Sequence, residues 1–248
     1  MTGTIMKKSS IAIILISVAL LTATRGYSQT SSGELNAIQT VVPFLTIAPD
    51  SRAGAMGDAG VATSPDIYSM HWNPAKFAFL DGKAGAGISY SPWLRNLVPD
   101  INIAYLSGYY RIDLKQVVSA SLLYSSLGDV PFTDNYGNLE RTFKPNELAF
   151  DLGYSRVFAD HFSGGIAFRF IYSNLTGGAY SGGTATRPGI SFAADIGGYS
   201  HTDISPFSKD GQFGLGFNLS HIGSDTSYYD GHTSTLGPIY LCLGAAGP

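Results

Sequence analysis

The stretch of sequence that decides the fold reads Glu147-Leu148-Ala149-Phe150-Asp151-Leu152-Gly153-Tyr154-Ser155-Arg156-Val157. Apolar side chains alternate along it with polar or small ones, so the pattern predicts a β-strand with one apolar and one polar face. Strands of about ten residues with aromatic side chains on the apolar face are typical of transmembrane barrels, whereas strands of soluble proteins average about five or six residues. The sequence therefore predicts the wall of an outer-membrane barrel.

The same period of two recurs along most of the chain after residue 83. Further strands are predicted at residues 84–91, 101–110, 117–127, 162–174, 189–199 and 212–222, and from about residue 239. In the strand at 101–110, we assign Ile101, Ile103, Tyr105 and Tyr109 to the apolar face. The pattern predicts an all-β, antiparallel transmembrane barrel of which about eight strands are present.

The N-terminus has the parts of a secretory signal peptide. Lys7 and Lys8 are positively charged, residues 11–21 form a short apolar core, and Gly26 and Ser28 lie where a signal peptidase requires small residues. We expect residues 1–28 to be removed on export. The apolar core is shorter than the roughly 20 residues of a membrane-spanning helix.

Composition argues against several classes of protein. Charged residues make up 13% of the chain, whereas ordinary soluble domains contain about 25%. The net charge of -3 gives no basic surface for nucleic acid. Cys242 is the only cysteine, so no disulfide framework is possible. The sequence contains no nucleophile elbow, zinc-protease motif or phosphate-binding loop, and we predict no enzyme activity, catalytic residue, cofactor or metal site.

Four charged residues lie on the polar faces of neighbouring predicted strands, and we expect them to face the lumen of the barrel. They are Glu147, Asp151, Arg169 and Asp195. They could form a polar conduit or a surface on which a plug docks. The alternative, which we favour, is an internal ion-pair network in which the charges satisfy one another.

The connections between strands alternate in length. Residues 111–116 and 158–161 are short and are expected on the periplasmic side, whereas residues 92–100, 128–146, 175–188 and 223–237 form longer loops expected outside the cell. The loop at 128–146 carries Phe132, Tyr136 and Phe143. These aromatic side chains suit contacts with a protein partner, but they could also shape an apolar pocket.

Residues 29–83 lack the strand pattern and are expected to form an N-terminal plug. Their most specific motif is Asn73-Pro74-Ala75, because Asn-Pro initiates a turn and proline fixes φ. A plug of this size needs a wider lumen than eight strands enclose. The sequence also ends early in a strand, so we expect residues 84–248 to be the N-terminal part of a larger, truncated barrel.

An ordered series of motifs resembles the PorV (LptO) family of the Bacteroidetes type IX secretion system, which is related to the FadL-type outer-membrane barrels. The motifs are Val42-Pro43-Phe44-Leu45-Thr46-Ile47-Ala48-Pro49-Asp50-Ser51-Arg52, Asn73-Pro74-Ala75-Lys76-Phe77, Tyr90-Ser91-Pro92-Trp93-Leu94-Arg95, Tyr105-Leu106-Ser107-Gly108-Tyr109-Tyr110-Arg111 and Lys144-Pro145-Asn146-Glu147. The resemblance implies a barrel of fourteen strands with an N-terminal plug in the cell outer membrane.

The resemblance also implies a function in protein secretion. The expected partners are an SprA-type translocon, cargo proteins with type IX C-terminal signal domains, a PorU-type attachment complex and outer-membrane lipid. A member of this family receives cargo at the translocon and passes it to the attachment complex. The alternative is a FadL-type channel for hydrophobic small molecules.

Overall fold

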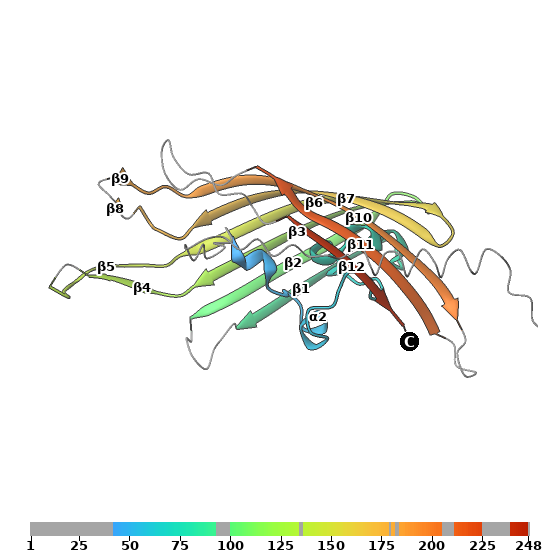
Figure 1. Ribbon diagram of the computed structural model, residues 1–248, viewed down its shortest axis with the longest axis horizontal. Coiled ribbons are helices and arrows are strands. Elements are labelled where there is room, and N and C mark those ends of the chain that lie inside the picture. The colour runs from blue at the N-terminus through green and yellow to red at the C-terminus, as the bar shows by residue number, and fades with distance from the viewer. Residues whose placement is uncertain are drawn as a thin grey trace, which may run out of the picture. The chain divides into compact units, whose positions relative to one another are not determined.

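The computed structural model describes residues 42–92, 100–133, 136–178, 180–181, 184–204, 211–224 and 239–247 (Figure 1). The predicted signal peptide, the first part of the predicted plug and the motif residues Trp93, Leu94 and Arg95 lie outside these ranges. None of the helices in the described ranges reaches the length and hydropathy of a membrane-spanning helix.

Eight strands form one antiparallel sheet, in the order β1-β2-β3-β6-β7-β10-β11-β12 (Figure 1). Their bounds are Ala84–Pro92 (β1), Ile101–Arg111 (β2), Gln116–Leu127 (β3), Asn146–Ala159 (β6), Phe162–Asn174 (β7), Gly189–Ile204 (β10), Gly211–Gly223 (β11) and Tyr240–Ala246 (β12). Each strand pairs with the next along this order, and among the described residues β1 and β12 do not pair with each other. The predicted all-β antiparallel fold is confirmed, and the open sheet is consistent with part of a barrel.

Two small ribbons lie in the long connections. β4 (Val130–Thr133) pairs with β5 (Leu139–Phe143), and β8 (Tyr180–Ser181) pairs with β9 (Thr184–Ala185). The long loop predicted at residues 128–146 is therefore partly a two-stranded ribbon. β10 also continues beyond its predicted end at residue 199, because its pairing with β11 persists to Ile204.

The polar face of the sheet is buried and the apolar face is exposed. On β6, Asp151 is 2% exposed whereas Leu152 is 52% exposed, and on β7 the same values hold for Arg169 and Phe168. A soluble sandwich has the opposite arrangement, with its apolar side chains inside. An apolar face of this extent is what the lipid-facing side of a barrel wall presents.

Residues 42–83, which we call the helical segment, pack on the buried face of the sheet. They form η1 (Pro43–Thr46), α2 (Ser51–Ala55), α3 (Ser69–Trp72) and η2 (Pro74–Phe79). Asp50 caps α2 by accepting a hydrogen bond from the backbone N of Ala53 at 2.8 Å, and its second carboxylate oxygen accepts one from Trp72 Nε1 at 3.2 Å. The first hydrogen bond satisfies a free N–H group at the start of α2, which is very short, and the second links Asp50 to α3.

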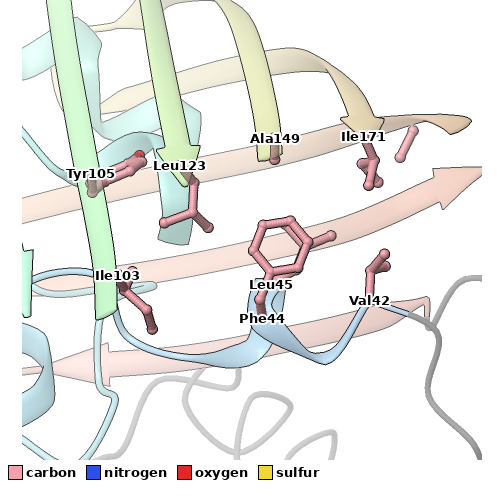
Figure 2. Close-up of a cluster of buried hydrophobic side chains, with 9 residues drawn as sticks. Val42, Phe44, Leu45, Ile103, Tyr105, Leu123, Ala149 and Ile171 are labelled. Atoms are coloured by element: carbon pink, nitrogen blue, oxygen red, sulfur yellow. The ribbon is translucent and has the colours of Figure 1, made fainter. Parts of the chain in front are cut away.

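A hydrophobic cluster joins the start of the helical segment to the sheet (Figure 2). Val42, Phe44 and Leu45 pack against buried side chains of five strands, which are Ile103, Tyr105, Leu123, Ala149, Ile171 and Ala193. A second cluster contains Met70, Phe77, Val117 and Ala167. Each large side chain in these clusters contributes about 1.5–3 kcal/mol through burial of apolar surface.

The residues that we assigned to the apolar face of the strand at 101–110 share one face, but it is the buried face of the sheet and not the exposed one. Ile103 and Tyr105 of β2 point to the buried face, and the ring of Tyr109 lies 5.9 Å from that of Phe77. Leu106 is exposed on the opposite face. Both faces of β2 are apolar, because its inner side packs on the helical segment, so alternation alone could not identify the outer face.

Candidate functional site

The Asn73-Pro74-Ala75 turn ties the helical segment to the sheet through a buried amide. Asn73 Nδ2 donates to the carbonyl oxygens of Val61 and Gly198, each at 3.0 Å. Its Oδ1 accepts from the backbone N of Ala75 at 3.1 Å, which caps η2. One fully buried side chain thus links a loop of the helical segment, the start of η2 and the strand β10.

Serine and glycine residues of three strands complete the surroundings of this turn. Ser155 Oγ donates to the carbonyl oxygen of Pro74 at 2.7 Å, and Ser163 Oγ donates to that of Ala75 at 2.8 Å. A Cβ atom at Gly165 would lie 2.5 Å from the backbone N of Ala75, so only glycine allows this close approach. We call the contributing residues of β6, β7 and β10 the turn cradle: Ser155, Ser163, Gly165 and Gly197.

Three of the four charges expected in the lumen lie together on the buried face. Arg169 Nε lies 2.6 Å from Asp151 Oδ1, and Arg169 Nη2 lies 3.3 Å from Asp195 Oδ2. Ser121 Oγ donates to Asp151 Oδ2 at 2.8 Å, and the backbone N of His221 donates to Asp195 Oδ1 at 2.8 Å. We call Ser121, Asp151, Arg169 and Asp195 the charge cluster. Its geometry is that of an internal ion-pair network.

Glu147, the fourth predicted charge, lies apart from the charge cluster. It is 1% exposed, and its Oε1 accepts a hydrogen bond from Ser173 Oγ at 2.8 Å. Within the ranges that the structure describes, it forms no ion pair. The four predicted residues therefore share one face of the sheet but do not form a single site.

A pocket of about 210 Å³ lies between the helical segment and the strands β11 and β12. It is lined by Leu45, Thr46, His71, Trp72, Asn218, Ser220, His221, Tyr240 and Cys242. Burial, and secondarily the positive charge of Arg169, lowers the pKa of His71 from its usual 6.5 to about 3. His71 is therefore neutral at physiological pH and contributes an uncharged aromatic wall.

The three aromatic residues of the predicted partner loop have different environments. Phe132 and Phe143 are half-buried, and their ring centroids lie 6.4 Å apart across the β4–β5 ribbon. Tyr136, between the two strands, is 91% exposed. Of the three, Tyr136 alone has most of its surface exposed.

Arg111, at the end of β2, is a structural residue that the sequence analysis missed. Its guanidinium donates to the carbonyl oxygens of Ala78, Leu80, Gly82 and Leu114. These contacts fix the end of the helical segment to the turn between β2 and β3. No strand pattern could reveal them, because all the acceptors are backbone atoms.

The carboxylates of the charge cluster, in the described part of the chain, are paired. Among the described residues, no group of three or more His, Cys, Asp or Glu side chains could hold a metal ion. The carboxylates of the charge cluster are engaged by Arg169, Ser121 and the backbone of His221. These contacts link neighbouring strands of the sheet to one another.

Comparison with models of protein families matches residues 30–247 to the family described as type IX secretion system protein PorV. The match covers most of the chain and includes the helical segment, the turn cradle, the charge cluster and the β4–β5 ribbon. A search of curated proteins gives no match.

Proposed function

The chain belongs to the PorV family of type IX secretion system proteins, and we propose that it receives cargo proteins at the translocon in the outer membrane. In this proposal it binds an SprA-type translocon, takes up cargo with a C-terminal signal domain and passes it to a PorU-type attachment complex at the cell surface. The observation that carries the proposal is the family match over residues 30–247, and the reversed sheet, whose apolar face is exposed while its polar face is covered, supports a place in the outer membrane.

The dimensions of the strands support the proposed place in the membrane. β6 has 14 residues and β7 has 13, whereas about 9–11 residues of a tilted strand cross a bilayer. We propose that residues 1–28 are removed on export, that residues 29–83 form the plug and that residues 84–248 form part of the barrel wall. The exposed side chains of β6 and β7 then contact lipid.

The contacts of the turn cradle support a fixed plug. Withdrawal of the helical segment would break the hydrogen bonds of Asn73, Ser155 and Ser163. Each of these hydrogen bonds contributes a net stabilisation of about 0.5–1.5 kcal/mol. We therefore propose that the lumen beside β6, β7 and β10 stays closed, and that cargo is handled at the extracellular loops.

A second candidate function is a FadL-type channel for hydrophobic small molecules. The pocket beside His71 favours it, because Leu45, Trp72 and Tyr240 give this pocket an apolar and aromatic lining. The two functions predict different defects in a strain from which the gene is deleted. A secretion component is needed for protein cargo, whereas a channel is needed for uptake of a small compound.

Deletion of the gene should stop cargo delivery. We expect proteins with type IX C-terminal signal domains to accumulate in the periplasm or to remain unattached at the surface, and the intact gene should restore their attachment. The measurement is fractionation of cargo from the deletion strain, the complemented strain and the parent. Normal release and attachment of cargo, together with reduced uptake of a hydrophobic compound, would reject the secretion function and favour the channel.

A further inference from the structure

Two histidines lie opposite each other at the short-turn end of the sheet. His161 is in the turn between β6 and β7, and His201 is near the end of β10. β7 and β10 pair as far as Phe162 and Ser200, and the backbone N of His201 then donates to the carbonyl oxygen of His161 at 3.1 Å. Side chains at directly opposite positions of antiparallel strands share a face of the sheet and lie within contact distance.

The imidazole rings belong to the buried face and are held close together. His161 lies two residues before Ser163 and His201 two residues after Tyr199, and Ser163 and Tyr199 are both buried. The two imidazole centroids lie 5.6 Å apart, with the ring planes at 85°. Phe79, the last residue of η2, meets the ring of His201 edge-on at 4.3 Å between centroids. This contact restricts rotation of the His201 ring before any ligand binds.

The ring nitrogens of the two histidines remain available for a ligand. His161 is exposed, so solvent reaches its imidazole. His201 Nδ1 is buried and has no hydrogen-bond partner in the part of the chain that the structure describes. Buried polar atoms are normally hydrogen-bonded, and an ion is one of the few explanations for an exception. Neutral imidazole is also the commonest metal ligand in proteins.

The separation of the two rings fits one shared metal ion. A histidine nitrogen binds Zn²⁺ at about 2.0–2.1 Å in a tetrahedral arrangement, which places the centres of two ligating rings about 5–6 Å apart. The observed 5.6 Å lies within this range. The carboxylate of Asp203, two residues further along β10, accepts a hydrogen bond from Gln212 Nε2 at 3.3 Å. We therefore assign water to the remaining coordination positions.

We propose that His161 and His201 form a two-histidine site for a divalent transition-metal ion. The bound ion links the β6–β7 turn to β10 beside Phe79, at the end of the helical segment. Imidazole ligands suit zinc and copper, whereas Mg²⁺ and Ca²⁺ prefer oxygen ligands and should not bind. The site does not depend on the proposed function in secretion. The sequence analysis predicted no metal site, because the two histidines are far apart in the sequence and meet only through strand pairing.

Calorimetric titration of the full-length protein with Zn²⁺ tests the site, with the protein purified without a histidine tag. His161→Ala and His201→Ala should each weaken binding at least about tenfold. The double variant should lose much less than the product of the two single losses, because both side chains bind the same ion. Losses that multiply would mean two separate ions and overturn the proposal. Zinc binding that does not saturate below about 1 mM, or equal binding of Mg²⁺, would overturn it as well.

Chemical modification of the unmodified protein gives a local readout that does not require the variants to fold. Diethyl pyrocarbonate modifies accessible imidazole nitrogens, and peptide mass spectrometry measures the rate at each histidine. Zn²⁺ should slow the modification of His161 and His201 over the same range of zinc concentration, whereas Mg²⁺ should leave both rates unchanged. An unchanged rate at either histidine in the presence of Zn²⁺ would exclude a shared ion.

Discussion

Replacement of Arg169 by methionine is expected to destabilise the protein by about 3–5 kcal/mol, because one partner of a buried ion pair is removed while the others stay. Arg169 lies 2.6 Å from Asp151 and 3.3 Å from Asp195, and all three side chains are at most 3% exposed. Without the guanidinium, two carboxylates remain buried with no countercharge. The fraction of folded protein should be measured by heat-modifiable gel mobility over a series of urea concentrations in lipid vesicles.

Two control variants separate charge from side-chain size. Arg156→Met removes an exposed arginine from β6 and should leave the urea midpoint unchanged. The triple variant Arg169→Met/Asp151→Asn/Asp195→Asn should recover much of the lost stability, because it removes the unpaired charges as well. If Arg169→Met were as stable as Arg156→Met, the charge cluster would not contribute to the stability of the sheet.

The second large effect is expected on the outer face, where Phe168→Arg should cost about 2–4 kcal/mol near the middle of the bilayer. Phe168 lies in the middle of β7, is 52% exposed, and stacks on Phe192 with ring centroids 5.7 Å apart. An arginine there would place a charge in hydrocarbon. The same assay in lipid vesicles measures the loss.

Phe168→Leu is the control for this position, because it keeps an apolar side chain on the same face. It should assemble nearly as well as the unmodified protein. In a soluble sheet, an exposed phenylalanine could be replaced by arginine with little loss, and solubility would improve. Unimpaired assembly of Phe168→Arg would therefore remove the argument for a lipid-facing surface.

The strands could be predicted from sequence because one local rule governs most of them. Along β6 and β7, most outward positions carry an apolar side chain and most inward positions carry a small or polar one, so a period of two is visible. β2 breaks the rule, since Ile103 and Tyr105 pack on Val42, Phe44 and Leu45. Its inner face could not be recognised without knowing what covers it.

The contacts between strands could be predicted only in part. Alternation predicts that Asp151, Arg169 and Asp195 share one face of the sheet. The distances between their side chains depend on the register in which the strands pair. Asp151 pairs directly with Arg169, whereas Asp195 lies opposite Ala167 and reaches Arg169 diagonally. Glu147 pairs with Ser173 four residues further along β6, which separates it from the others.

The turn cradle and the contacts of the β4–β5 ribbon could not be predicted from the sequence. Ser155, Ser163 and Gly165 have ordinary inward positions, and nothing local marks them as neighbours of Pro74 and Ala75. In the same way, Phe132 and Phe143 could be recognised as loop aromatics. Their engagement with Arg141 and Gly177 depends on a ribbon that the pattern did not predict.

The central claim is that the exposed apolar face contacts lipid. It is tested most directly by the accessibility of spin labels on this face to oxygen, which concentrates in lipid, and to a water-soluble nickel complex. Single cysteines would carry nitroxide labels at Leu152, Ile166, Phe168 and Ile190, in a Cys242→Ser background in lipid vesicles, with a label at Lys144 as the aqueous reference. We expect the four face positions to favour oxygen, most strongly at Phe168 in the middle of its strand, whereas Lys144 should favour nickel. Nickel accessibility at the face positions equal to that at Lys144 would contradict the account.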